Sequence, residues 1–251
     1  MNFLTLKFGD RYSADYVNKL YKGLKRNSSA PFDFYCYTEN PQGLDENIKV
    51  IELLKRKGVR RHWYRFDFHD MPFLKGHKCV VMDIDAVITG NIDEVINFDL
   101  PRGHYGALPK WWGKGNNING GFQMFYQGET KYLSDEFNSR PTYWQTYYFK
   151  AGRSPYLFGE QLFIEEHLQQ DITFLPKEWF ARFGSCEDKT GTEAYNLLEK
   201  YWKENVDSHK RMIDINGKIH DKIKYVQFSG NGNWIEEHSH VPFVNEYWNN
   251  I

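Results

Sequence analysis

The sequence is poor in cysteine and contains no long apolar run. Three cysteines occur in 251 residues, Cys36, Cys79 and Cys186, and they are too few and too scattered for a disulfide framework or a zinc site. No apolar segment approaches the roughly 20 residues that span a bilayer. The N-terminus also lacks the charged stretch and long apolar core of a secretory signal. We therefore expect a cytoplasmic protein without a transmembrane segment.

The sequence has almost no net charge but many aromatic residues. Its 32 Lys and Arg residues nearly balance 33 Asp and Glu residues, for a net charge of -1. Since no global field would recruit nucleic acid, no nucleic-acid partner is expected. The basic run at 55–61 is interpreted as a solvated loop, with an anionic acceptor such as a phosphorylated lipid or sugar as the alternative. Aromatic residues reach 18%; such rings suit sugar-facing surfaces, although most are expected in the core.

The N-terminal region has the pattern of an α/β fold. Residues 2–9 predict a strand that stops at Gly9, and apolar residues then recur at helical spacing from Tyr16 to Leu24. A strand, a glycine and a helix in this order begin nucleotide-binding α/β folds. Tyr12 comes just after the turn, where an exposed ring could stack on a base. Packing of Tyr12 against the helix is the favoured alternative.

The rest of the chain continues with strands and helices. Strands are expected at 32–38, 48–53, 79–82, 104–108, 172–176 and 225–230. Helices are expected at 63–68, at 132–151 with a break at Pro141, at 158–168, at 193–204 and at 241–248. A length of 251 residues suits one α/β domain.

The central motif is an apolar strand that runs into two carboxylates. Cys79 to Met82 reads as a buried strand, and Asp83 and Asp85 follow it. Side chains two apart in a strand share a face, so both carboxylates could reach one hard cation. A divalent ion held there would neutralise a diphosphate. The alternative is an acidic turn after a core strand.

Two further polar motifs occur in the second half. Asn119, Gly120 and Gly121 precede an expected strand; glycine allows close backbone approach, and asparagine offers donors and acceptors to hydroxyls. A tight turn is the alternative. Glu160 and Gln161 are expected in the first turn of a helix, where an acidic residue is often simply a favourable helix start.

Taken in order, these motifs resemble the GT-A nucleotide-sugar glycosyltransferases. Within them the chain is most similar to glycosyltransferase family eight, the glycogenin-like and bacterial lipopolysaccharide sugar transferases, over nearly its whole length. The similar segments are Phe8-Gly9 with Tyr12, Arg65, Met82-Asp83-Ile84-Asp85 with Asn91-Ile92-Asp93, Asn119-Gly120-Gly121, Gly159-Glu160-Gln161, and the stretch from Gln227 to Trp234.

The resemblance implies a fold and an activity. The fold would be α/β, a single GT-A domain over 1–251 with a mixed central sheet flanked by helices. Residues 1–100 would form the nucleotide-binding half, and 101–251 the donor-sugar and acceptor half. The activity would be metal-dependent hexosyl transfer from a nucleotide-sugar, with UDP-sugar as the expected donor, to a hydroxyl of a glycan or lipid-linked acceptor. The family retains anomeric configuration and uses Mn²⁺ or Mg²⁺.

The resemblance also assigns residues to roles. Asp83, Asp85 and Gln227 would be the metal ligands, and Glu160 and Gln161 the catalytic residues. The donor would contact Phe8, Gly9, Tyr12, Arg65, Asp83, Ile84, Asn119, Gly120, Gly121, Gly230, Asn233 and Trp234.

The chain departs from the family pattern at several of these positions. Gln227 stands where the family has a metal-binding His, and its neutral amide oxygen is a weaker ligand. Asn233 stands where the family has a Lys that meets the diphosphate, and the Pro of that motif is missing. Glu160 replaces an Asp. These changes put the metal shell and the diphosphate contacts in question more than the fold.

Two alternatives remain open. In a phosphatase of the haloacid-dehalogenase type, Asp83 would be the nucleophile and Asp85 the acid/base. That family usually begins its core with this motif, whereas here 82 residues precede Asp83, and we find no convincing paired-acid loop. The second alternative is a non-catalytic binder of carbohydrate or nucleotide-sugar, which the missing His and Lys would suit.

Overall fold

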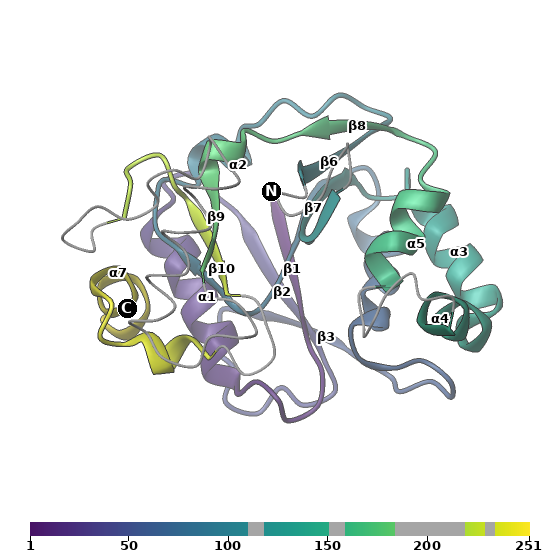
Figure 1. The fold of residues 1–251 in the computed structure, drawn as a ribbon, viewed down its shortest axis with the longest axis horizontal. Coiled ribbons are helices and arrows are strands. Elements are labelled where there is room, and N and C mark those ends of the chain that lie inside the picture. The colour runs from purple at the N-terminus through teal and green to yellow at the C-terminus, as the bar shows by residue number, and fades with distance from the viewer. Residues whose placement is uncertain (110–117, 151–158, 184–218, 229–233) are drawn as a thin grey trace. The chain divides into compact units, whose positions relative to one another are not determined.

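The computed structural model describes residues 1–109, 118–150, 159–183, 219–228 and 234–251. The chain forms two compact units whose segments alternate along the sequence (Figure 1). The first unit comprises Met1–Ala14, Phe32–Met82 and Asp99–Leu175. The second unit comprises Asp15–Pro31, Asp83–Phe98 and Pro176–Ile251. The expectation of one domain with halves that meet at residue 100 stays a prediction.

The first unit is built on a seven-stranded sheet with the order β3-β2-β1-β4-β7-β6-β8. Its strands are β1 (Asn2–Lys7), β2 (Asp33–Thr38), β3 (Lys49–Glu52), β4 (Lys78–Met82), β6 (His104–Pro109), β7 (Ile118–Tyr126) and β8 (Asp171–Phe174). Strands β3, β2, β1 and β4 run parallel to one another. β7 runs opposite to β4 and β6, and β8 is parallel to β6. The expected α/β fold with a mixed central sheet is confirmed.

An aromatic core packs beside this sheet. It joins η1 (Arg61–His69) to α3 (Lys131–Ser139), α4 (Pro141–Lys150) and α5 (Gly159–His167). The rings of Trp63 and Phe66 stack on Phe137 at centroid distances of 5.3 and 4.6 Å, and Phe163 meets Phe66 edge-on at 4.8 Å. The break at Pro141 separates α3 from α4 as expected, because proline has no N–H to continue a helix but suits a helix start. These buried rings serve the core.

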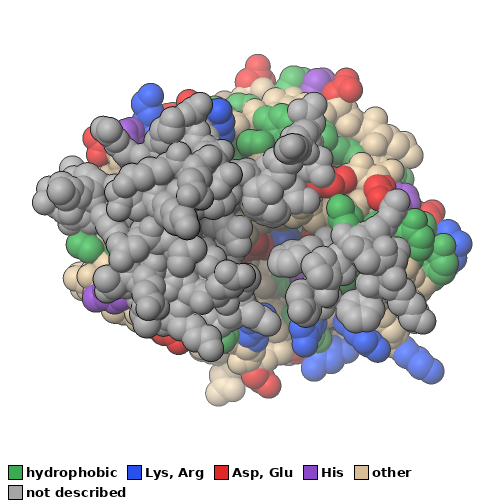
Figure 2. Space-filling model, viewed as in Figure 1, with side chains coloured by type: hydrophobic (Ala, Val, Ile, Leu, Met, Phe, Trp, Pro, Cys, Tyr) green, Lys and Arg blue, Asp and Glu red, His purple; other side chains and the backbone are tan. Residues whose placement is uncertain are grey.

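The basic run at 55–61 lies over the helical side of the first unit. Arg56 is paired internally, with 2.7 Å from its guanidinium to Asp67 and 2.9 Å to Asn138. The other cationic side chains of the run, those of Lys55, Lys57, Arg60 and Arg61, are exposed. Figure 2 shows several Lys and Arg side chains at the lower right of the face drawn, where Figure 1 places α4. This exposure agrees with a solvated loop.

The second unit contains a three-stranded sheet and the remaining helical segments. The sheet has the order β5 (Ala86–Ile88), β10 (Tyr225–Phe228) and β9 (Phe180–Phe183), with β10 antiparallel to β5 and parallel to β9. Its helices and turns are α1 (Ala14–Arg26, with Ala14 in the first unit), α2 (Asp93–Ile96), η3 (Lys177–Trp179), η4 (Ile235–His238), α7 (Pro242–Val244) and η5 (Asn245–Asn249). The Tyr16 hydroxyl donates to Glu236, and its ring packs 5.0 Å from that of Trp248. These contacts attach the C-terminal segment to α1.

Two motifs are placed differently from the expectation. Asp83 and Asp85 lie in the connection between β4 and β5, so the argument from side chains on one face of a strand does not apply. Asn119, Gly120 and Gly121 lie within β7 instead of before it. The expected helix at 193–204 lies outside the described residues. Among the described helices, none is both long and apolar enough to cross a bilayer.

Candidate functional site

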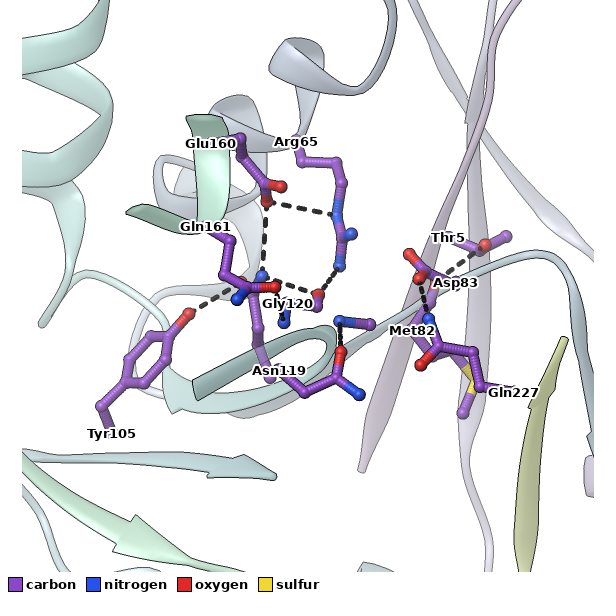
Figure 3. Close-up of polar contacts among 12 residues, drawn as sticks. Thr5, Arg65, Met82, Asp83, Tyr105, Asn119, Gly120, Glu160, Gln161 and Gln227 are labelled. Atoms are coloured by element: carbon purple, nitrogen blue, oxygen red, sulfur yellow. Dashed lines mark hydrogen bonds and ion pairs between the residues drawn. The ribbon is translucent and has the colours of Figure 1, made fainter. Parts of the chain in front are cut away.

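A cluster of polar side chains lies in the interior of the first unit and is centred on Arg65. This side chain is 9% exposed, and its Nη2 donates to the carbonyl oxygen of Gly120 at 2.6 Å (Figure 3). Its Nε lies 3.7 Å from Oε1 of Glu160, whose side chain is 6% exposed. Charges taken out of water are tolerated when they are paired and hydrogen-bonded. Arg65 therefore ties η1, β7 and α5 together.

The Asn-Gly-Gly motif forms an irregularity in β7. Ala107 of β6 pairs with Gln123, yet the next residue, Leu108, pairs with Asn119, so residues 120–122 are extra on the β7 side. Glycines favour such bulges because they have no side chain to pack. The Gly120 N–H, freed from the β6 ladder, donates to Gln161 Oε1 at 2.9 Å. The register of β6 against β7 thus gives the glycines a structural reason.

Asn119 and Gln161 each satisfy a backbone group of this bulge. The side-chain oxygen of Asn119 accepts the N–H of Gly121 at 2.8 Å. A Cβ at Gly120 would lie 3.3 Å from Gln161 Oε1, which leaves little room for any side chain. The bulge therefore aims one carbonyl at Arg65 and one N–H at Gln161.

Gln123 and Tyr105 complete the cluster, and sequence reasoning missed both. Gln123 Nε2 lies 3.0 Å from the Gly120 carbonyl and 3.4 Å from Glu160 Oε1. Its Oε1 accepts the Tyr105 hydroxyl at 2.7 Å. Burial raises the pKa of Tyr105 well above its usual 10, so the hydroxyl stays protonated and donates. The available signal was a second amide in the expected strand, four residues after Asn119.

Glu160 and Gln161 lie at the start of α5 because Gly159 lets that helix approach the aromatic core. A Cβ on Gly159 would lie 2.6 Å from the Cβ of Tyr148 and 2.9 Å from Cζ2 of Trp63. No real side chain fits at such distances. Further along α5, Glu165 Oε1 accepts the N–H of Ile118 at 3.1 Å.

A second group of polar residues lies in the second unit, beside the two aspartates. β10 runs antiparallel to β5 with Gln227 opposite Ala86, directly after Asp85. Gln227 Nε2 donates to Asp83 Oδ2 at 2.6 Å (Figure 3). The Phe228 N–H donates to the carbonyl of Asp85 at 2.8 Å. The C-terminal strand is thus joined to the Asp-x-Asp segment by both backbone and side chain.

This group fits a hard divalent cation in its chemistry. Two carboxylates and an amide offer the oxygen ligands that Mg²⁺ and Mn²⁺ accept. In the observed orientation the nitrogen of the Gln227 amide faces Asp83, so the amide must turn before its oxygen can act as a ligand. Among the described residues, no three His, Cys, Asp or Glu side chains are grouped to hold a metal. The carboxylates of Asp83 and Asp85 are therefore the charged ligands on which a cation there would depend.

The residues expected at the nucleotide form a separate group in the first unit. Phe8 stacks on Tyr64 at 5.2 Å. Gly9 has a positive φ of 66° and donates its N–H to Glu39 at 2.8 Å. The half-exposed ring of Tyr12 has the Arg11 guanidinium 5.3 Å from its centroid.

The other expected donor contacts are distributed as follows. Ile84 is buried in the second unit, where Trp234 is half-buried and lies 6.5 Å from the Tyr16 ring. Gly230 and Asn233 lie outside the described residues.

Comparison with known proteins identifies the fold. No known protein family and no curated protein matches the sequence. Among solved structures, an active-site mutant of LgtC is similar with a TM-score of 0.60 and 13% identity, over 92% of this chain and 88% of that chain. The galactosyltransferase LgtC in complex with donor and acceptor sugar analogues is similar with a TM-score of 0.58 and 11% identity, over 99% of this chain and 96% of that chain. The glycosyltransferase GlyE of Streptococcus pneumoniae TIGR4 has a TM-score of 0.58 and 13% identity, over 100% of this chain and 64% of that chain. The chain therefore has the GT-A type of glycosyltransferase fold.

Proposed function

We propose that the chain is a metal-dependent glycosyltransferase that transfers a sugar from a nucleoside-diphosphate sugar to a hydroxyl acceptor. The fold is shared with LgtC, whose structure holds donor and acceptor sugar analogues. UDP is the nucleotide that the resemblance to family eight favours, a glycan or a lipid-linked sugar is the acceptor, and transfer retains anomeric configuration. The buried Arg65 cluster and the Asp-x-Asp group supply the polar residues that this reaction needs.

The observation that carries the proposal is the contact between Gln227 and Asp83. In the family the C-terminal strand brings a metal ligand to the two aspartates. Here β10 pairs with β5 directly after those aspartates, and the Gln227 amide lies 2.6 Å from the Asp83 carboxylate across 144 residues of sequence.

The Asp-x-Asp group is assigned to the leaving nucleotide. A bound divalent cation supplies Lewis-acid stabilisation of the negative charge that develops on the diphosphate. Asp83 and Asp85 would hold this cation through their carboxylates. Gln227, whose amide nitrogen donates to Asp83, would offer its amide oxygen as a neutral third ligand if the amide turned.

The interior cluster of the first unit is assigned to the donor sugar. Asn119 and Glu160 bind its hydroxyls, and Gln161 lies near the reacting carbon. Arg65 was expected at the diphosphate. Because its guanidinium is engaged with the Gly120 carbonyl and Glu160, Arg65 is assigned as a positioning residue for the Glu160 carboxylate and the β7 bulge.

The proposal is tested by binding and turnover together. We expect UDP to bind tightly by calorimetry with Mn²⁺ and weakly with a chelator, because without the cation the diphosphate would face two carboxylates. We expect Asp85→Ala to abolish transfer from a nucleotide-sugar while its melting temperature stays close to that of the wild type.

Each alternative has its own outcome in these experiments. Equal UDP affinity with and without metal contradicts the metal assignment. Binding of nucleotide-sugar without turnover identifies a non-catalytic binder. A phosphoenzyme formed at Asp83 identifies the phosphatase.

A further inference from the structure

Glu39 is fixed at the end of β2, beside the turn that follows β1. A hydrogen bond of 3.1 Å from the Asn40 N–H to the Thr38 hydroxyl closes a turn around Glu39 and fixes its backbone. Its Oε1 accepts the Gly9 N–H at 2.8 Å. The Lys55 ammonium lies 3.6 Å from the same oxygen, and this lysine side chain is 65% exposed. Glu39 is thus held firmly, whereas Lys55 can move.

The second carboxylate oxygen of Glu39 lacks a hydrogen bond. Its Oε2 is buried and has no hydrogen-bond partner among the described residues. A buried carboxylate oxygen without a donor is costly. A ligand that brings an N–H to this oxygen would therefore bind favourably.

There is open space beside Gly9, whose N–H donates to this carboxylate. The φ of Gly9 is +66°, and a Cβ built on Gly9 would meet no atom within 4 Å. Gly9 and Glu39 follow the carboxyl ends of two adjacent parallel strands, β1 and β2. Open α/β sheets bind their ligands at this edge.

We infer that Glu39 recognises the base of the donor nucleotide and selects bases that present a ring N–H. This inference rests on the proposed function and names the residue that selects the base. In uracil and thymine the N–H at N3 is flanked by carbonyl groups, and in guanine the N–H at N1 is next to one. The N–H donates to Glu39 Oε2, and the Lys55 ammonium donates to the neighbouring carbonyl. Cytosine and adenine present a ring nitrogen with a lone pair in that place, which the carboxylate repels.

The first experiment measures the base preference of the wild-type protein. UDP, GDP, CDP and ADP are titrated separately by calorimetry with the same Mn²⁺ concentration. We expect UDP or GDP to bind about ten-fold or more tightly than CDP and ADP, the scale of a hydrogen bond to a charged group. The UDP and GDP titrations show which of the two rings fits.

The second experiment uses Glu39→Gln, which keeps the shape of the side chain. The Gly9 N–H needs an acceptor, so the amide oxygen takes the place of Oε1 and the NH₂ group takes the place of Oε2. An NH₂ group donates to the ring nitrogen of cytosine and repels the N–H of uracil or guanine. We expect the UDP-to-CDP affinity ratio, or the GDP-to-CDP ratio, to fall about ten-fold or more.

Glu52→Gln is the matched control, since Glu52 is exposed on β3. It removes the same charge and should leave the ratio unchanged. Melting temperatures of both variants verify that they are folded. A role of Glu39 limited to holding the Gly9 turn would change all four affinities together and leave the ratios unchanged.

The outcomes separate this inference from the proposed function. If the wild type turns over a nucleotide-sugar but Glu39→Gln leaves the ratios unchanged, the Glu39 assignment alone is overturned. A wild-type preference for CDP or ADP overturns it as well and leaves sugar transfer standing. If the wild type binds none of the four nucleotides, both the inference and the proposed function are overturned.

Discussion

The Tyr105→Phe substitution tests whether the hydrogen bonds around Glu160 matter for both stability and activity. It removes one oxygen from a fully buried ring, and with it the 2.7 Å bond to Gln123 Oε1. Gln123 is only 1% exposed, so water cannot replace the lost donor. Leaving a buried acceptor without a partner costs about 1–3 kcal/mol. For a chain of this size we expect a fall in melting temperature of roughly 2–12 °C.

The same substitution should reduce activity. Gln123 also contacts the Gly120 carbonyl and lies 3.4 Å from Glu160. Once its oxygen is released, the amide can rotate, and Glu160 loses a contact that orients it. We expect kcat for transfer from a nucleotide-sugar to fall more than the affinity for UDP, because the cluster is assigned to the sugar and not to the nucleotide.

Tyr143→Phe is the control for this prediction. Tyr143 is 49% exposed, and a surface change of this kind usually alters stability by less than about 0.5 kcal/mol. A double-mutant cycle of Tyr105→Phe with Gln123→Met measures the coupling, which we expect at about 0.5–3 kcal/mol. If Tyr105→Phe melts and turns over like Tyr143→Phe, the network around Gln123 is not what orients Glu160.

The remaining predictions concern three other positions. Gly159→Ala forces a Cβ to within 2.6 Å of the Tyr148 Cβ. We expect the free energy of unfolding to fall by about 1–3 kcal/mol, and activity to fall because the start of α5 is displaced. An unchanged melting temperature would contradict the packing described. Asp93 accepts hydrogen bonds from Ser29, Ala30 and Ser28, and these lower its pKa from 3.8 to about 2, with the largest contribution from Ser29. The stabilisation from these bonds is fully present above the pKa of Asp93 in the unfolded chain and is lost as the pH falls from about 4 to about 2. The difference in melting temperature between wild type and Asp93→Asn should therefore shrink to zero over that range. A difference that stays constant would contradict the role given to the Asp93 carboxylate. Gln227→His should tighten Mn²⁺ binding in the presence of UDP more than Mg²⁺ binding, because imidazole suits transition metals, while Gln227→Ala should change it little; no gain in the His variant would contradict the place given to Gln227.

Local patterns were sufficient to predict most elements of the chain. The apolar run before Asp83 predicted β4, helical spacing after Gly9 predicted α1, and Pro141 predicted the break between α3 and α4. These features depend on residues close in sequence, because strand and helix periods and the missing N–H of proline act locally. The mixed sheet and the partnership of Gln227 with the aspartates were expected only through the resemblance of ordered motifs to a family.

The tertiary structure alone decided which polar groups meet. Arg65 reaches the Gly120 carbonyl across 55 residues of sequence, and Glu39 reaches the Gly9 N–H across 30. Neither pairing follows from a local period. The Arg65 contact depends on the bulge in β7, and the Glu39 contact depends on the parallel alignment of β1 and β2. Burial then made these groups depend on one another, since a polar atom removed from water must find its partner within the protein. The sequence determined the strands and helices, and long-range packing determined which side chains form the candidate site.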